Sequence, residues 1–196
     1  MYRFYLAAVD MLPAALILIP FFWLLNRILF RNMRKCISYY LFACYLAVVY
    51  VLVGLPSVSY IRLEVNLNLL PVIGMLVDWK NSILNIMLFV PIGMMLPLLW
   101  NHFRNFKRTV LFGFVMSVTI ELLQILTYRA TDVNDLITNT LGVYIGYLGS
   151  TALQRKFPTP SENNTFELVI VIITVLLTMF FLYPFISAVF WDWILR

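Results

Sequence analysis

Charged side chains are scarce in this sequence. Asp, Glu, Lys and Arg make up 12% of its 196 residues, hydrophobic residues make up 63%, and the mean hydropathy is +0.91. An average soluble domain carries about 25% charged residues. This composition excludes an ordinary soluble domain and predicts a protein that crosses a membrane several times.

Residues that bind metals or form disulfides are equally few. The only histidine, His102, lies far in the sequence from the acidic residues, and no set of residues has the spacing of a zinc site. Cys36 and Cys44 fall around the start of one apolar run, on the side that we expect to be reducing, so we expect no disulfide. We predict no metal and no cofactor.

The net charge of +5 is not accompanied by a basic stripe with interleaved aromatic residues, so we predict no nucleic-acid partner. We attribute the charge to membrane topology and to attraction toward an anionic inner leaflet. Membrane lipids are the partners that this composition predicts.

Six stretches are long and apolar enough to cross a bilayer, which takes roughly 20 residues. They are 11–30, 37–56, 82–100, 109–127, 132–153 and 166–190, of which the fifth is more polar at its start. The first is too long, and too weakly preceded by positive charge, for a cleaved signal peptide. We predict an all-α membrane protein, a bundle of about six transmembrane helices in a single membrane domain over 1–196.

Lysine and arginine cluster after the first, third and fifth stretches, which should place those connections in the cytoplasm. These residues are Arg27, Arg31, Arg34 and Lys35, then Arg104, Lys107 and Arg108, then Arg155 and Lys156. Both termini are therefore expected on the extracytoplasmic side. On that side, the loop 57–81 mixes apolar and polar residues, and it can be a lid over a site between the helices or a connector resting on lipid.

Polar residues recur at helical spacing inside three of the apolar stretches. Asn81 and Asn85 lie one turn apart at the outer end of the third stretch, ahead of a proline, Pro91, that should bend the helix. Ser117, Glu121 and Gln124 follow i, i+4, i+7 spacing in the fourth and form one stripe. Such a stripe should face protein or water and not lipid.

Glu121 lies about six residues from the end of its helix, which places it roughly 9 Å inside the apolar core. An unpaired carboxylate at that depth costs about 3 kcal/mol, so it must take up a proton or find a partner. Arg129 is the nearest candidate cation. It can form a structural ion pair, or it can meet the phosphate or carboxylate of a ligand.

The fifth stretch begins with acidic residues on one face. Asp132, Asp135 and Asn139 share i, i+3, i+7 spacing, and Asp132 can cap the helix. Further along, small residues including Gly142 and Gly146 form a stripe that we interpret as a close helix contact.

All these polar positions fall at the outer ends of the third to fifth stretches, so one shared outward-facing site is the simplest account. The candidate ligand-binding residues are Asn81, Asn85, Ser117, Glu121, Gln124, Arg129, Asp132, Asp135 and Asn139. Glu121 and Asp135 are also the candidate acid and base if the site is catalytic.

Four motifs between residues 68 and 146, the first of them in the loop 57–81, resemble the VanZ-like membrane proteins. They are Asn68-Leu-Leu-Pro71; Asn85-x-x-x-Phe89-x-Pro91-x-Gly93; Ser117-x-x-x-Glu121-x-x-Gln124; and Arg129-x-x-Asp132-x-x-Asp135-x-x-x-Asn139-x-x-Gly142-x-x-x-Gly146. Val72 departs from the phenylalanine that the family often has there. The resemblance places a family core at 37–153, with flanking spans at 1–36 and 154–196.

The resemblance implies a multi-pass protein of the bacterial plasma membrane, from a family linked to low-level resistance to lipoglycopeptides such as teicoplanin. Three functions follow as hypotheses. The site binds a lipid head group, a lipid-linked cell-wall precursor or a lipoglycopeptide; it is a membrane-embedded hydrolase or transferase for a lipid-linked substrate; or it is a structural clamp in a protein that acts through a partner. The sequence leaves the oligomeric state open.

Overall fold

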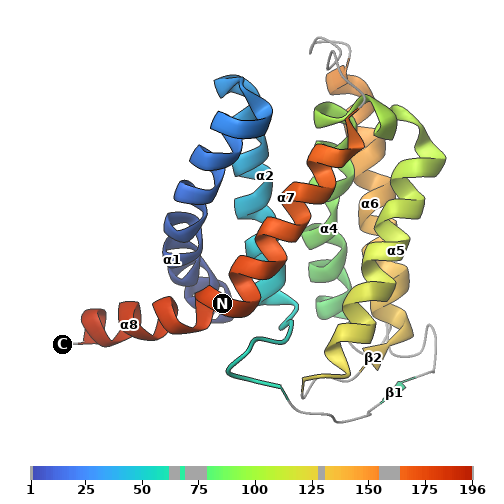
Figure 1. Ribbon diagram of the computed structural model, residues 1–196. Helices are drawn as coiled ribbons and strands as arrows, with labels where there is room; N and C mark the ends of the chain where they lie inside the picture. The colour runs from blue at the N-terminus through green and yellow to red at the C-terminus, as the bar shows by residue number, and fades with distance from the viewer. Residues whose placement is uncertain (1, 62–66, 69–78, 128–130, 155–163, 196) are drawn as a thin grey trace. The chain divides into compact units, whose positions relative to one another are not determined.

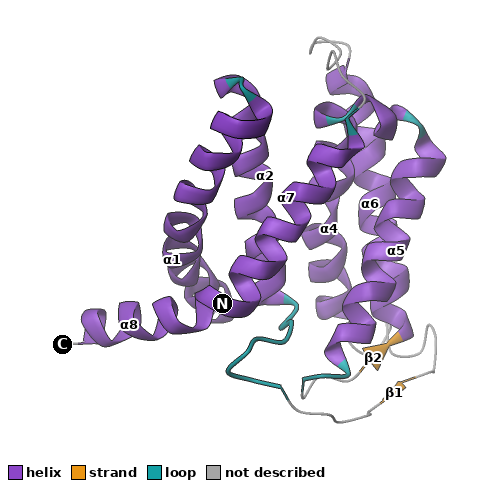
Figure 2. Cartoon of the chain, viewed as in Figure 1, coloured by secondary structure: helices purple, strands orange, loops and turns teal. Residues whose placement is uncertain are grey.

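A computed structural model describes residues 2–61, 67–68, 79–127, 131–154 and 164–195. The chain divides into two compact units, the first formed by 1–61 with 166–196 and the second by 62–165 (Figure 1). The described residues of each unit lie mostly in helices (Figure 2).

The first unit contains α1 (Tyr2–Leu25), which continues as a π-helix (Asn26–Phe30), α2 (Met33–Leu52), α7 (Thr165–Leu177), a second π-helix (Thr178–Leu182) and α8 (Tyr183–Leu195). The turn before α2 passes through Arg31, whose φ of 48° is left-handed. The side chain of Asn32 then caps α2 by accepting hydrogen bonds from the backbone N–H groups of Arg34 and Lys35, at 3.1 and 3.3 Å. This tight turn lays α1 and α2 side by side (Figure 1).

A partly buried ion pair joins α2 to α7. The ammonium of Lys35 lies 2.8 Å from Oε1 of Glu167, and the hydroxyl of Tyr39 donates to Oε2 at 2.8 Å. Glu167 is only 3% exposed. A carboxylate buried to this extent is costly unless its charge is compensated, so these two contacts explain how α7 tolerates it.

The sixth predicted stretch, 166–190, is not one straight helix. α7 and the π-helix after it run for about 27 Å at 1.5 Å per residue, which is close to the thickness of the apolar core. The chain then turns, and α8 leaves in a different direction (Figure 1). Pro184, at the second position of α8, has no backbone N–H to donate to the carbonyl four residues earlier. This missing hydrogen bond accounts for the interruption of the α-helix.

The second unit contains α4 (Trp79–Leu99), a 3-10 turn (Asn101–Arg104), α5 (Phe106–Gln124) and α6 (Val133–Gln154). Two short strands, β1 (Leu67–Asn68) and β2 (Thr131–Asp132), pair in parallel, with Leu67 opposite Thr131 and Asn68 opposite Asp132. Phe89, Ile92 and Leu96, spaced i, i+3, i+7, form the fully buried face of α4.

Glycines allow α4 and α6 to touch backbone to backbone. A Cβ added to Gly146 would overlap the carbonyl oxygen of Val90, and one added to Gly142 would overlap that of Ile86. From the other side, a Cβ on Gly93 would overlap the carbonyl of Val143. The small-residue stripe is therefore a packing contact, as the sequence indicated.

The prediction of an all-α membrane protein is confirmed. By length and composition, four helical segments are suited to cross a membrane: Leu12–Phe30, Met33–Leu52, Trp79–Leu99 and Thr165–Trp193. α5 and α6 are long enough but more polar, since α5 alone holds Lys107, Arg108 and Glu121. The position of the termini and the division into a family core and flanking spans stay predictions.

Candidate functional site

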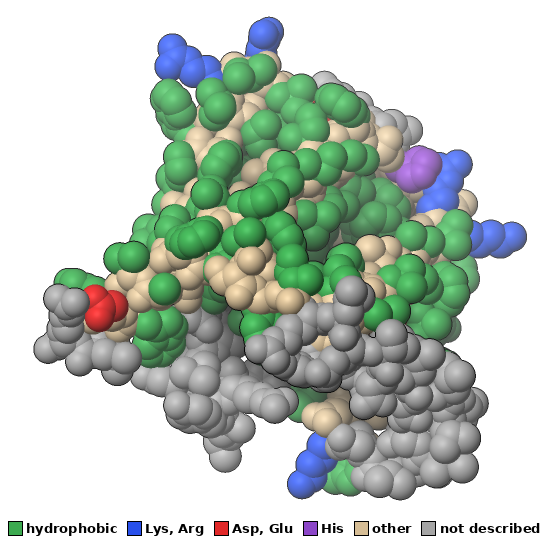
Figure 3. Space-filling view, turned by 60° about the horizontal axis from the view of Figure 1, so that its bottom comes forward, with side chains coloured by type: hydrophobic (Ala, Val, Ile, Leu, Met, Phe, Trp, Pro, Cys, Tyr) green, Lys and Arg blue, Asp and Glu red, His purple; other side chains and the backbone are tan. Residues whose placement is uncertain are grey.

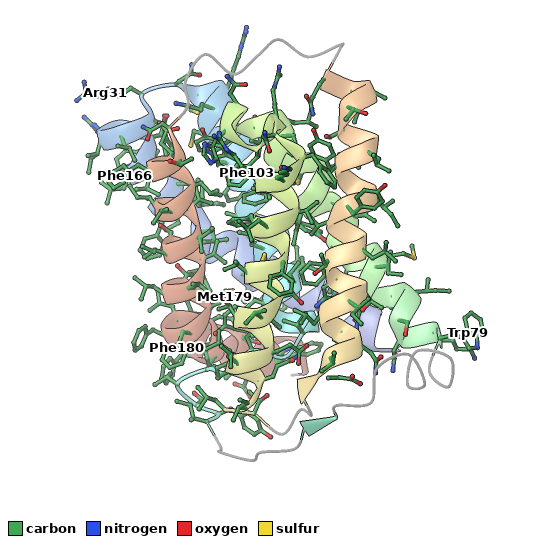
Figure 4. The ribbon with its side chains drawn as sticks, turned by 90° about the vertical axis from the view of Figure 1, so that its right-hand side faces the viewer. Arg31, Trp79, Phe103, Phe166, Met179 and Phe180 are labelled. Atoms are coloured by element: carbon green, nitrogen blue, oxygen red, sulfur yellow. The ribbon has the colours of Figure 1, made fainter. Side chains whose placement is uncertain are left out.

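Three helices of the second unit bring polar side chains to one end of that unit: the start of α4, the end of α5 and the start of α6. Figure 4 shows Trp79, the first residue of α4, at this end and Phe103, just before α5, at the other. We define the polar cluster as six side chains, predicted from the sequence, that form hydrogen bonds here. They are Asn85, Ser117, Glu121, Asp132, Asp135 and Asn139.

Glu121 fixes the start of α6. Its Oε2 accepts a hydrogen bond of 2.9 Å from the backbone N–H of Asp132, and the Glu121 side chain is only 6% exposed. A backbone donor of this kind is one partner that a buried carboxylate needs. Since Arg129 lies outside the described residues, the predicted pairing of Glu121 with that arginine stays a prediction.

Asp132 caps α6, as its position before Val133 indicated. Its Oδ1 accepts from the backbone N–H of Asn134 at 2.8 Å and from the Asn134 side-chain amide at 2.7 Å. A carboxylate at the N-cap satisfies free N–H groups and interacts favourably with the helix dipole. Glu121 and Asp132 together therefore hold the β2–α6 junction.

Asn85 and Asp135 join α4 to α6. The amide of Asn85 donates to Oδ1 of Asp135 at 2.7 Å, and both side chains are half-buried. A charge-assisted hydrogen bond across two helices is stronger than a neutral one. The expectation that Asn85 and Asp135 belong to one site is consistent with this contact.

Ser117 and Asn139 form the most buried contact, between α5 and α6. The Asn139 amide nitrogen lies 3.0 Å from Oγ of Ser117, and the two residues are 3% and 0% exposed. Oδ1 of Asn139 is buried and has no hydrogen-bond donor within reach among the described residues. If the amide is turned over, the nitrogen is the atom left over. One polar atom of Asn139 is thus available for another partner.

Two further residues predicted for the site, Gln124 and Asn81, lie outside the polar cluster as defined above. Gln124 is 3% exposed at the last position of α5, and its backbone carbonyl accepts from the hydroxyl of Thr127 at 3.0 Å. Asn81 is exposed on the first turn of α4, and its place in the site stays a prediction.

Two features of this end were not anticipated. Asn134 is 3% exposed and braces Asp132, but it lies off the i, i+3, i+7 face that drew attention to its neighbours. The pairing of β1 with β2 was also missed, because nothing local predicts that residues 67–68 bond to residues 131–132. This pairing fixes part of the loop 57–81 against the segment that Glu121 holds.

The chemistry of the polar cluster is that of hydrogen bonding. It offers two amides, a hydroxyl and three carboxyl groups; Oε2 of Glu121 accepts from the backbone of Asp132, and Oδ1 of Asp135 accepts from Asn85. The described residues contain no group of three His, Cys, Asp or Glu that could hold a metal ion. Such a set of donors and acceptors suits a polar organic ligand with hydroxyl, amide or phosphate groups.

Comparison with known proteins gives the family. Over 70 residues the chain is 34% identical to Protein VanZ of Enterococcus faecium, a match that covers 35% of this chain and 43% of that protein. The match thus spans less than half the length of the curated relative, and no solved structure matches. The sequence model of the VanZ/LLP1 family matches residues 42–154, which include α4, α5, α6 and the whole polar cluster. Because this match covers more than half of its residues, the chain belongs to the VanZ/LLP1 family.

Proposed function

We propose that the polar cluster binds the head group of a membrane lipid or of a lipid-linked envelope molecule at the outer surface of the bacterial plasma membrane. The observation that carries this proposal is the unpaired amide atom of Asn139, buried beside Ser117 at the meeting point of α5 and α6. A buried acceptor without a donor costs about 1–3 kcal/mol. A hydroxyl or amide of a bound head group would remove this cost.

The setting favours a ligand that arrives from the bilayer. Large apolar side chains on the helices of this unit are exposed, among them Met87 on α4 at 64% and Leu122 on α5 at 60%. In a membrane protein such faces contact acyl chains. A lipid can therefore lie along the outside of the helices while its head group reaches the polar cluster at the end of the unit.

In this proposal Arg129 binds the negatively charged group of the ligand. A guanidinium at the edge of a cluster of amides and carboxyl groups would bind a phosphate in the bidentate geometry that arginine favours. Glu121 and Asp132 would then keep the adjoining segment in place through their backbone contact, so their role is positioning and not acid–base chemistry. A phosphorylated, lipid-linked cell-wall precursor has the required chemistry.

This proposal links the site to the resistance that the family resemblance implies. A lipoglycopeptide such as teicoplanin carries an acyl tail and would reach the same site from the bilayer. Binding of the antibiotic, or of the precursor that it targets, would change susceptibility without a reaction. We therefore propose a role in lipoglycopeptide resistance or in another process of the cell envelope.

The experiment is native mass spectrometry of the purified protein with a polyprenyl phosphate. Arg129→Ala should weaken binding by about tenfold, because a charge-assisted pair is lost. Asn139→Ala should weaken it as well, since the ligand then loses its buried partner. Thermal melting of each variant checks that it is folded.

Lys80→Ala is the matched control, because Lys80 is an exposed cation on the first turn of α4, at the same end of the unit. It should retain binding. Equal binding by the wild-type protein and a folded Arg129→Ala variant would refute the proposed ligand site, and equal weakening by Lys80→Ala would reduce it to general attraction of anions.

A further inference from the structure

The opposite end of the second unit carries a basic group that the proposed function does not use. We infer that this group binds the phosphate of an anionic phospholipid. It comprises His102, Arg104, Lys107 and Arg108, which we call the basic turn, located in the 3-10 segment and the first turn of α5. In Figure 3 the histidine lies against basic side chains on the surface of the protein.

Arg104 provides the central observation. Its Nε and Nη2 atoms are buried and have no hydrogen-bond partner among the described residues. These two nitrogens form one edge of the guanidinium, and that edge matches the spacing of two oxygens on a phosphate or carboxylate. A charged donor shielded from water and lacking an acceptor is costly, so an anion at this edge would be strongly stabilising.

The backbone around Arg104 is held firmly. The hydroxyl of Tyr147 on α6 donates to the carbonyl of Arg104 at 2.8 Å. The side chain of Asn105 then caps α5 by accepting from the N–H of Arg108 at 3.3 Å, and the hydroxyl of Thr109 donates to the carbonyl of Phe103 at 2.5 Å. The segment that carries the guanidinium is therefore preorganised for a ligand.

A second pair of basic residues extends the site. Nη1 of Arg108 lies 3.0 Å from Nδ1 of His102. Because a guanidinium can only donate, Nδ1 is the acceptor, and the neutral ring then carries its proton on Nε2. Both residues therefore present further N–H donors beside Arg104.

The described acids of this unit lie at its other end. Glu121, Asp132 and Asp135 belong to the polar cluster, and Glu121 is about 20 Å along α5 from Arg108 at 1.5 Å per residue. An internal ion pair with one of these carboxylates is out of reach. The anion that compensates the basic turn must come from outside this part of the chain.

Aromatic side chains place the basic turn at the level of lipid head groups. Phe106 is 42% exposed and stacks edge-on against Tyr144 and Tyr147, with ring centroids 5.7 and 5.4 Å apart. Tyr144 is itself 38% exposed. Exposed aromatic rings are typical of the membrane interface, where phospholipid phosphates are the abundant anions. This setting favours a lipid phosphate over a soluble one.

The test is native mass spectrometry of the full chain in detergent with added phosphatidylglycerol. Arg104→Ala should bind about tenfold less phosphatidylglycerol than the wild-type protein. Arg104→Lys should also bind less, because a lysine keeps the charge but loses the two-nitrogen edge. Melting curves confirm that each variant is folded, and the lysine variant is informative if the alanine variant unfolds.

Three comparisons complete the experiment. Arg34→Ala removes an exposed arginine of the first unit and should leave binding unchanged. Zwitterionic phosphatidylcholine should bind weakly, and millimolar inorganic phosphate should not displace phosphatidylglycerol. Equal binding by folded Arg104 variants, an equal loss in Arg34→Ala, or displacement by free phosphate would each overturn the assignment. Arg129→Ala should leave phosphatidylglycerol at the basic turn, so the two sites fail or succeed separately.

Discussion

Replacing Gly146 by alanine should destabilise the protein by about 3 kcal/mol, the upper part of the usual range for overpacking. The added methyl group would lie on the carbonyl oxygen of Val90, and backbone atoms cannot rotate away as a side chain can. α4 and α6 would have to separate along their contact. The fraction of folded protein in detergent, followed by circular dichroism during unfolding, measures this effect.

Gly149 supplies a control on the same helix. A Cβ at this position meets nothing within 4 Å, so Gly149→Ala changes only helix propensity. That change favours the folded helix by about 0.5–1 kcal/mol. If both alanine variants unfold alike, or if Gly146→Ala is as stable as the wild-type protein, the close contact between α4 and α6 is wrong.

Asn85→Asp should destabilise the protein by about 1.5–3 kcal/mol, the range for a lost hydrogen bond to a charged group. The new carboxylate would replace the amide that donates to Asp135 at 2.7 Å, and two like charges would then face each other across α4 and α6. Adding Asp135→Asn restores an amide opposite a carboxylate. The double variant should recover most of the stability, though not the part due to a carboxylate in the first turn of α6.

This exchange also separates two roles of Asp135. If the residue only joins α4 to α6, the double variant should regain stability and ligand binding together. If Asp135 acts as an acid or base, stability should return while any turnover of a lipid-linked substrate stays lost, because the carboxylate has moved to another helix. A double variant no more stable than Asn85→Asp would show that the pair is not coupled.

The helices could be predicted because their signal is local. Runs of apolar residues of membrane length predicted six helical stretches, and the glycine spacing on α6 predicted a close helix contact without naming α4 as the partner. The break before α8 was missed even though Pro184 is visible in the sequence, since a proline near a helix start is tolerated and need not bend the chain. The pairing of Lys35 with Glu167 was missed because these residues are 132 positions apart.

The polar cluster could be predicted only as a set of faces. Helical spacing predicted the polar face of α5 that holds Glu121 and the polar face of α6 that holds Asp135 and Asn139. The structure brings these two faces to the same end of the unit. Spacing cannot choose partners, so the contact of Glu121 with a backbone N–H was not foreseen. The β1–β2 pairing depends on contacts between segments more than 60 residues apart, which no local pattern encodes.

The central claim is that the polar cluster is a ligand site, and an experimental structure with a bound polyprenyl phosphate tests it most directly. We predict head-group density within hydrogen-bond distance of Asn139, between the start of α6 and the end of α5. A structure that shows the lipid elsewhere, with both polar atoms of the Asn139 amide bonded inside the protein, would contradict the claim.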